Sequence, residues 1–164
     1  MAVCDYCNKS FSLFGVSENG YTYCSGKCKD QARALLKVLD GFNPQEIDAY
    51  IERVHSGPCK QCAQSRPVDF YQSYRVFSVI IFTRWTTHNH FVCRLCARNE
   101  QLKSLAYSAL LGWWGFPFGL ILTPIQIIRN VVGLADSSDR SHPSVRLQNL
   151  LKLNLARQVA AAPR

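Results

Sequence analysis

Eight cysteines are the residues of this sequence whose type and spacing point most directly to chemistry. They form four close pairs: Cys4 and Cys7, Cys24 and Cys28, Cys59 and Cys62, and Cys93 and Cys96. A close pair offers two sulfur ligands from one tight turn, and a structural zinc ion takes four ligands in a tetrahedron. The pattern therefore predicts two tetrathiolate zinc sites, one built from the first four cysteines and one from the last four, with two bound zinc ions.

Other uses of the same cysteines stay open at this stage. Four thiolates also bind iron. A CxxC pair can cycle between dithiol and disulfide. A third interpretation is that the cysteines are buried free thiols. Structural disulfides are disfavoured, because Cys4 and Asp5 stand where a signal peptide needs an apolar core. His88 and His90 are alternative ligands close to Cys93. Four cysteines per site leave no open position for a water molecule, which disfavours a catalytic zinc.

The net charge bears on the choice of partner. The formal value of +8 invites a nucleic-acid partner, because clustered lysine and arginine attract phosphate. Zinc bound by four thiolates carries a formal charge of −2. Two such sites reduce the total to about +4, and no basic run typical of an interaction tail is present. Nucleic acid therefore stands as the alternative partner.

Hairpins and helix starts must bring the first four cysteines together. The residues between Cys7 and Cys24 are expected to form a hairpin, and Cys24 and Cys28 begin a helix of regular apolar spacing. The positive end of a helix stabilises thiolates. A second helix is expected next, with Asn43 as its N-cap and Pro44 as its first residue.

The second set of cysteines encloses a strand-rich region. Residues 67–92 are rich in valine, isoleucine, aromatic residues and threonine, which predicts a sheet of two or three strands. The polar segment 86–90 is expected to be its turn. Cys93 and Cys96 then begin another helix, so the order of knuckle, hairpin and helix occurs in both halves.

The most apolar part of the chain follows. Leu105–Ile128 contains 24 residues without a charge, and one helix of this length reaches roughly 36 Å, enough for a transmembrane helix. Gly112, Gly115 and Pro117 interrupt it, and the basic residues on its two sides show no asymmetry. The pattern predicts two half-helices with a bend near Pro117, forming an apolar hairpin that enters a membrane with both ends cytoplasmic.

The last segment is a polar linker followed by an amphipathic helix. Pro143 is expected to start this helix, whose leucines recur at helical spacing from Leu147 to Leu155. The helix can pack on the protein, rest on a membrane or bind a partner helix, and the pattern favours none of these.

Two resemblances add to this interpretation. Residues 4–40, with CDYC and YTYCSGKC leading into a helix, resemble the MYM-type and TRASH-type treble-clef zinc fingers. That resemblance implies a fold, and those families are implicated in metal sensing, nucleic-acid association and protein contacts. Residues 59–155 resemble a bacterial family of membrane-associated zinc-ribbon proteins, with SYRV between two CxxC pairs and GWWGFPFGLILTPIQ after them. No activity comes with this second resemblance.

These observations predict an α+β fold with two small treble-clef or zinc-ribbon-like modules, an apolar helical hairpin and a C-terminal amphipathic helix. The expected segments are a zinc-finger module (1–41), a linking helix (42–57), a second zinc-ribbon-like module (58–104), a membrane-associated hairpin (105–135), and a linker with the amphipathic helix (136–164).

The expected function is that of a non-enzymatic adaptor or scaffold at a membrane, with its zinc modules facing the cytoplasm. Membrane lipid and a protein are the expected partners, and no small-molecule substrate is evident, because the sequence shows no nucleophile with its base and no paired carboxylates. The alternative is a soluble zinc-dependent nucleic-acid-binding protein in which Tyr71, Tyr74 and Arg75 contribute stacking. A redox sensor or enzyme accessory is a third hypothesis.

Overall fold

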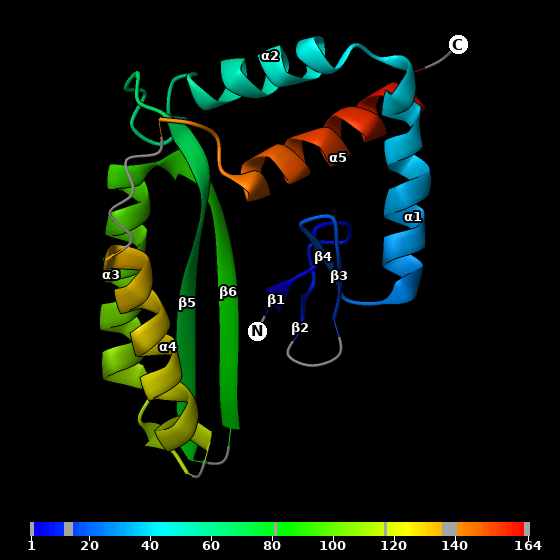
Figure 1. Ribbon diagram of the computed structural model, residues 1–164. Helices are drawn as coiled ribbons and strands as arrows, with labels where there is room; N and C mark the ends of the chain where they lie inside the picture. The colour runs from blue at the N-terminus through cyan, green and yellow to red at the C-terminus, as the bar shows by residue number, and fades with distance from the viewer. Residues whose placement is uncertain (1, 12–14, 81, 117, 136–140, 163–164) are drawn as a thin grey trace. The chain divides into compact units, whose positions relative to one another are not determined.

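The computed structural model describes residues 2–11, 15–80, 82–116, 118–135 and 141–162 (Figure 1). The chain has the expected α+β composition of elements, which divide into two compact units. The first unit is Met1–His55 with His142–Arg164, and the second is Ser56–Ser141. Each unit contains one set of four cysteines, and the C-terminal helix belongs to the first unit.

Four short strands form the two hairpins of the first unit. They are β1 (Ala2–Val3), β2 (Ser10–Phe11), β3 (Val16–Glu18) and β4 (Tyr21–Tyr23). β1 pairs antiparallel with β2, and β3 pairs antiparallel with β4. Asn19 and Gly20 connect β3 to β4 with positive φ angles of 50° and 79°, as tight two-residue hairpin turns require. A hairpin is thus present between Cys7 and Cys24, as predicted.

Helices make up the rest of the first unit. They are α1 (Gly26–Leu36), the 3₁₀ helix η1 (Lys37–Gly41), α2 (Pro44–His55) and α5 (Val145–Ala161). α2 begins where its capping residues predict, because Asn43 Oδ1 accepts a hydrogen bond of 3.0 Å from the Gln45 backbone N–H. α5 begins after Ser144, whose hydroxyl accepts from the Leu147 N–H. The predicted start of α2 at Pro44 is confirmed, whereas α5 begins at Val145, two residues after the predicted start at Pro143.

The amphipathic helix α5 packs on the first zinc module. Leu153 is fully buried in the cluster that contains Cys4, Tyr21 and Tyr23. At the polar margin, the Asn149 side chain donates to the Gly20 carbonyl at 2.9 Å. Of the three uses left open by the sequence, packing on the protein is the one that the structure shows.

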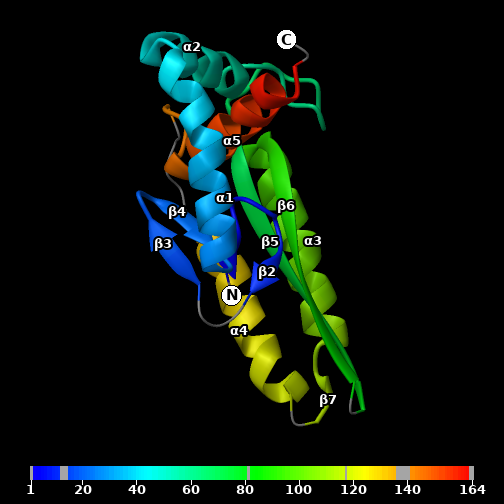
Figure 2. The same cartoon turned by 90° about the vertical axis from the view of Figure 1, so that its right-hand side faces the viewer.

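The second unit is built on a long β-hairpin. Its strands are β5 (Val68–Ile80), β6 (Phe82–Cys93) and β7 (Trp114–Gly115), and its helices are α3 (Arg94–Leu111) and α4 (Phe118–Ala135). The sheet has the order β6-β5-β7, with β6 antiparallel and β7 parallel to β5. Both views show α3 and α4 running alongside β5 (Figures 1 and 2).

The predicted position of the hairpin turn was wrong. Residues 86–90 lie inside β6, where Thr86 pairs with Arg75 and His90 with Tyr71. β5 instead ends at Ile80 and β6 begins at Phe82, which pairs with Val79. The polar residues misled the prediction because five of them follow one another, as in a loop, and only pairing with β5 shows that they belong to a continuous strand.

The apolar stretch is divided between two helices, as its glycines predict. α3 ends at Leu111 and α4 begins at Phe118, while Pro117 itself lies outside the described residues. Neither of these helices, nor any other in the described part of the chain, has the length and apolar character needed to cross a membrane. The membrane part of the expected apolar hairpin (105–135) is therefore not supported.

The faces of α3 and α4 that pack inward are polar. Their buried side chains include Gln101, Ser104, Ser108, Thr123, Gln126 and Asn130. These side chains are polar because they bond the backbone of β5 along the edge that faces away from β6. There the Asn130 side chain accepts from the Tyr74 N–H at 3.1 Å and donates to the Tyr74 carbonyl at 2.7 Å. Ser108 Oγ accepts from the Val76 N–H at 3.1 Å. Helix side chains thus take the place of a neighbouring strand.

Two glycines of the GWWGFPFG motif allow close packing at the helix break. A Cβ atom at Gly115 would lie 2.9 Å from Ser78 Cβ, and one at Gly119 would lie 2.7 Å from the Gly112 carbonyl oxygen. Both distances are too short for a side chain, so glycine lets this turn lie directly against β5.

Candidate metal centres

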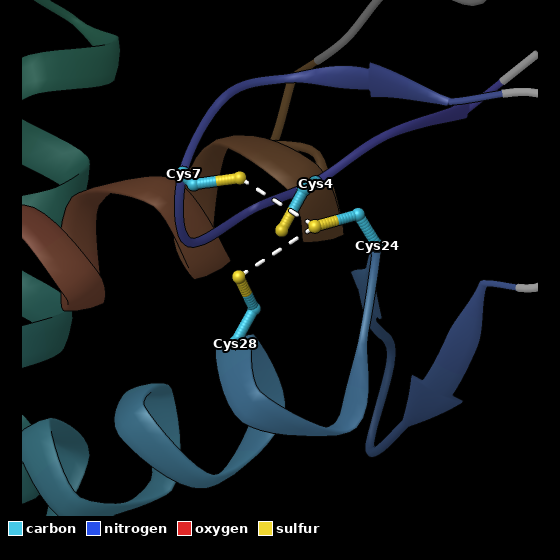
Figure 3. A group of neighbouring side chains, drawn as sticks. All are labelled: Cys4, Cys7, Cys24 and Cys28. Atoms are coloured by element: carbon cyan, nitrogen blue, oxygen red, sulfur yellow. Dashed lines mark hydrogen bonds between the residues drawn. The ribbon is translucent and has the colours of Figure 1, made fainter.

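The first centre gathers its ligands from three elements. Cys4 follows β1, Cys7 lies in the turn before β2, Cys24 follows β4, and Cys28 lies in the first turn of α1. Figure 3 shows the four side chains converging. Cys24 Sγ lies 3.6 Å from Cys7 Sγ and 3.5 Å from Cys28 Sγ. All four sulfur atoms lie within 4.8 Å of one another.

The second centre repeats this layout. Cys59 and Cys62 form the knuckle, Cys93 ends β6 and occupies the N-cap of α3, and Cys96 lies in the first turn of that helix. Cys62 Sγ and Cys93 Sγ are 3.7 Å apart, and the four sulfur atoms again lie within 4.8 Å of one another. The predicted repeat of knuckle, hairpin and helix start is present in both units.

The two knuckles share a backbone conformation as well. The residue after the second cysteine of each has positive φ, 59° at Asn8 and 56° at Ala63. Its N–H donates to the carbonyl of the first cysteine, at 2.9 Å for Cys4 and 2.7 Å for Cys59. Asparagine adopts this conformation readily, whereas alanine does so at a cost. Ala63 therefore gave no sequence signal of the turn that it makes.

The sulfur spacing fits one tetrahedral metal ion in each centre. Zn–S bonds of about 2.3 Å in a tetrahedron place sulfur atoms about 3.8 Å apart, and the Sγ–Sγ distances of 3.5 to 3.7 Å are close to that value. A disulfide needs about 2.05 Å. A cluster of several irons would hold the cysteines farther apart, because bridging sulfides lie between them. The two groups thus accommodate two zinc ions.

The histidine alternative is not supported. His90 Nε2 lies 2.9 Å from Ser73 Oγ, on the sheet. Neither His90 nor His88 belongs to the group formed by Cys59, Cys62, Cys93 and Cys96 in the described structure. The sulfur set is complete without them.

The thiols of the second centre differ in pKa. Burial raises the pKa of the Cys59 thiol, but backbone N–H groups of Cys93, Cys62 and Gln61 donate to its sulfur and lower the pKa to about 6. Burial and the neighbouring thiols raise the pKa of Cys96 to about 12. Burial also raises the pKa of Cys93. At neutral pH the metal-free centre therefore has a thiolate at Cys59 and thiols at Cys93 and Cys96.

These protonation states predict a steep pH dependence of zinc binding. Zinc binds thiolates, so it must displace at least the protons of Cys93 and Cys96, and zinc affinity should rise with pH. We expect the affinity of the second centre to increase roughly a hundredfold per pH unit between about pH 6.5 and 8. Competition with a chelator of known affinity, using a chain whose first centre is disabled by Cys24→Ser, measures this slope. An affinity independent of pH would contradict the assignment of these thiols.

The tyrosines expected to stack on nucleic acid have structural contacts. The Tyr74 ring lies under the Arg129 guanidinium, 5.3 Å from its centroid, and the Tyr74 hydroxyl donates to Gln72 Oε1 at 3.0 Å. Tyr71 packs against the cluster around Cys59. Arg75 instead lies in a pocket with Arg84, which the sequence pattern did not indicate because the two residues are brought together only by strand pairing.

No protein family model, curated protein or solved structure matches this chain. The resemblances to MYM-type and TRASH-type fingers and to the GWWGFPFG family therefore stay interpretations of the sequence. The zinc-compatible geometry of the two centres is the part of them that the structure supports.

Proposed function

We propose that this protein is a non-enzymatic scaffold that attaches peripherally to a membrane through one end of its second unit and presents surfaces to a protein partner. The observation that carries the proposal is the distribution of apolar side chains in that unit. Polar side chains face inward between the helices and β5, while large apolar side chains face outward. This is the reverse of the arrangement in an ordinary protein core.

The outward apolar residues gather where the β-hairpin turns and the helices break. This apolar tip consists of Ile80, Phe82, Leu110, Trp114 and Phe116. Trp114 is 71% exposed and Phe116 is 74% exposed. Figure 2 shows β7, which contains Trp114, near the end of β5 and the beginning of β6. Water-exposed clusters of this kind mark interaction sites, and tryptophan favours the membrane interface.

An apolar stripe along α4 extends this surface. Ile121, Ile125, Ile128 and Val132 are separated by three or four positions and are all exposed, so they share one side of the helix. Between the elements, small and polar residues such as Ser108 and Asn130 provide the hydrogen bonds. Membrane-associated helices use this combination of polar contacts inside and apolar contacts outside.

The zinc ions have a structural role in this proposal. Each centre supplies four sulfur ligands, so the metal has no open position at which to bind a substrate or activate water. Close cysteine pairs that serve as zinc ligands are typical of a reducing compartment, so in this proposal both centres lie in the cytoplasm. We therefore assign no catalytic step to either centre.

Membrane attachment through the apolar tip predicts a strong effect of charge there. In the double variant Trp114→Glu and Phe116→Glu, binding to phosphatidylcholine vesicles should fall at least tenfold, because each buried aromatic side chain contributes about 1.5 to 3 kcal/mol. Co-sedimentation with vesicles measures the change, and zinc content verifies the fold.

The control is Val145→Glu, which changes another exposed apolar residue, 63% exposed, at the start of α5 in the first unit. It should leave vesicle binding unchanged. The proposal fails if the unmodified chain stays in the supernatant with vesicles, or if the tip variant and the control bind equally well.

A further inference from the structure

A pocket of about 350 Å³ lies in the second unit on one face of the β5–β6 hairpin. Its lining residues are Arg75, Phe77, Arg84, Thr86, His88 and Tyr107. Strand register explains how most of them meet, because Arg75 pairs with Thr86 and Phe77 pairs with Arg84. Residues two apart on a strand point to the same face, so Arg84, Thr86 and His88 lie in one row. Tyr107 is contributed by α3.

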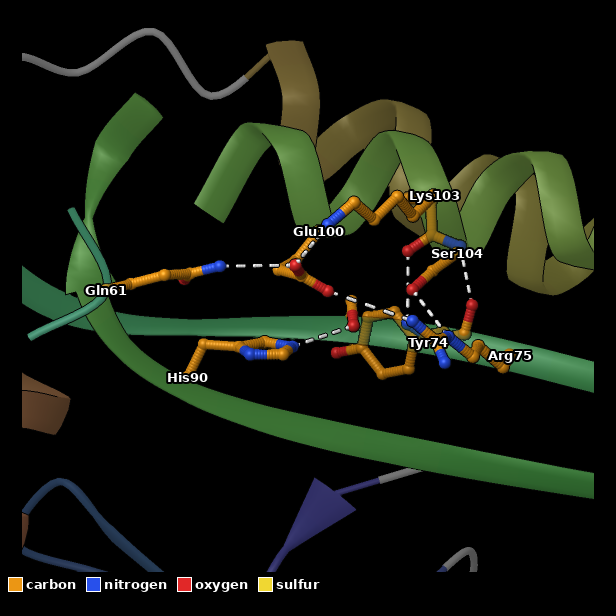
Figure 4. A network of polar contacts seen from close by, with 9 residues as sticks. Gln61, Tyr74, Arg75, His90, Glu100, Lys103 and Ser104 are labelled. Atoms are coloured by element: carbon orange, nitrogen blue, oxygen red, sulfur yellow. Dashed lines mark hydrogen bonds and ion pairs between the residues drawn. The ribbon is translucent and has the colours of Figure 1, made fainter. Parts of the chain in front are cut away.

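The guanidinium group of Arg75 is held in place by α3. Arg75 Nε donates to Ser104 Oγ at 3.0 Å, and its guanidinium carbon lies 5.8 Å from the centroid of the Tyr107 ring. Figure 4 shows Arg75 between Ser104 and the carboxylate of Glu100. A positioned guanidinium loses little conformational freedom when it binds an anion, which favours a specific site.

The nearby carboxylate is engaged mainly by other groups. Glu100 Oε1 accepts from Lys103 Nζ at 2.9 Å and from Gln61 Nε2 at 3.3 Å, whereas Arg75 is 3.8 Å from Oε2. The hydrogen bond from Lys103 lowers the pKa of Glu100, so this carboxylate is ionised. Arg84 forms no ion pair with another residue in the described part of the chain. The pocket therefore keeps a net positive charge.

The chemistry of the lining selects an oxyanion. Two guanidinium groups offer paired N–H donors that match phosphate, and the Thr86 hydroxyl adds a donor. Phe77 and Tyr107 provide apolar walls for the group that carries the phosphate. A phosphate ester with an apolar or glycerol-like substituent matches this combination.

The position of the pocket on the hairpin relates it to the apolar tip. Phe82, which is 61% exposed, lies on the same strand face as Arg84 and Thr86. At about 3.3 Å per residue, Arg84 lies about 7 Å and Thr86 about 13 Å from Phe82 along β6. Interfacial proteins insert apolar residues about 5 to 10 Å into the boundary between headgroups and acyl chains. Insertion of Phe82 to that depth brings the pocket to the level of the lipid phosphates.

We propose that this pocket binds the phosphate of an anionic phospholipid headgroup while the apolar tip inserts beside it. The inference rests on the proposed membrane attachment and adds the lipid class to it. A nucleic acid offers the same phosphate, but the continuity of the pocket with Phe82 favours a lipid.

The test compares Arg84→Gln with the matched control Arg98→Gln, an exposed arginine on α3 in the same unit. Vesicles of phosphatidylcholine alone are compared with vesicles containing phosphatidic acid. We expect Arg84→Gln to weaken binding to the phosphatidic acid vesicles about fivefold and to leave binding to phosphatidylcholine vesicles unchanged. Arg98→Gln should change neither. Arg75→Gln provides a second variant, with zinc content as the check on its fold.

The outcomes separate this inference from the proposed function. Equal binding of Arg84→Gln and Arg98→Gln to both vesicle types, with the tip variant still defective, would overturn the pocket and leave membrane attachment standing. Arg84-dependent binding of inorganic phosphate without vesicle binding by the unmodified chain would show a site for free phosphate and overturn the lipid. Arg84-dependent binding of a single-stranded RNA that exceeds vesicle binding would overturn it in favour of nucleic acid.

Discussion

Replacement of Cys4 by serine is expected to reduce the bound zinc from two ions to one and to unfold the first unit. Cys4 is fully buried, and its neighbours in the apolar cluster include Tyr21, Tyr23 and Leu153. A structural zinc ion contributes about 10 to 16 kcal/mol to the folding of a small domain at neutral pH. This is as large as the total stability of an ordinary domain, about 5 to 15 kcal/mol. Loss of the ion therefore removes the main source of stability from a unit with very short strands.

Metal analysis and circular dichroism measure this result. The zinc content should fall by one ion per chain, and α5 should become accessible to proteases, because Leu153 packs against the cluster that contains Cys4. Ser25→Ala is the matched control: Ser25 accepts from the Cys28 N–H at 3.3 Å but supplies no sulfur. Loss of this capping hydroxyl should lower the free energy of unfolding by about 1 kcal/mol and leave two zinc ions bound. A Cys4→Ser chain that retains two ions, or that is as stable as the control, would refute the structural role of this centre.

Replacement of Asn130 by leucine is expected to lower the free energy of unfolding of the second unit by about 2 to 6 kcal/mol. Asn130 is fully buried, and its amide bonds both the N–H and the carbonyl of Tyr74. Leucine has a similar volume but can form a hydrogen bond with neither the N–H nor the carbonyl of Tyr74. Each buried backbone group left without a partner costs about 1 to 3 kcal/mol, which gives the expected range.

Urea-induced unfolding followed by tryptophan fluorescence measures this difference. Ile128→Ala is the control on the same helix, because Ile128 is 61% exposed and should change the free energy of unfolding by about 0.5 kcal/mol or less. Equal stabilities of the two variants would show that the edge of β5 does not depend on the amide of Asn130.

The cysteine pairs that supply the metal ligands were predictable from sequence because each pair is local. A CxxC pair forms one turn, and each second pair stands at a helix start, so spacing alone grouped Cys4 with Cys7 and Cys93 with Cys96. The same holds for α2, whose start depends on Asn43 and Pro44, and for the break between α3 and α4. Each of these features depends on residues that are near one another in the chain.

Other features depend on residues that are far apart. The segment 86–90 was misassigned as a turn because its polar residues match a loop until β5 is placed beside them. The polar positions on α3 and α4 gave no sign that they bond the backbone of β5, since Asn130 and Tyr74 are 56 residues apart. Likewise, an amphipathic helix shows that it has an apolar side, but only the buried contacts of Leu153 show that this side packs on the first centre.

The sequence by itself determined the two four-cysteine sets, the α+β class, the main helix starts and the division of the apolar stretch. Local spacing and capping control all of these. Only the tertiary structure decided which side of each helix is buried, that the buried side of α3 and α4 is the polar one, and that Arg75 and Arg84 share a pocket. The physical reason is that strand register and helix docking are set by hydrogen bonds and packing between distant residues, and no periodicity within one segment records them.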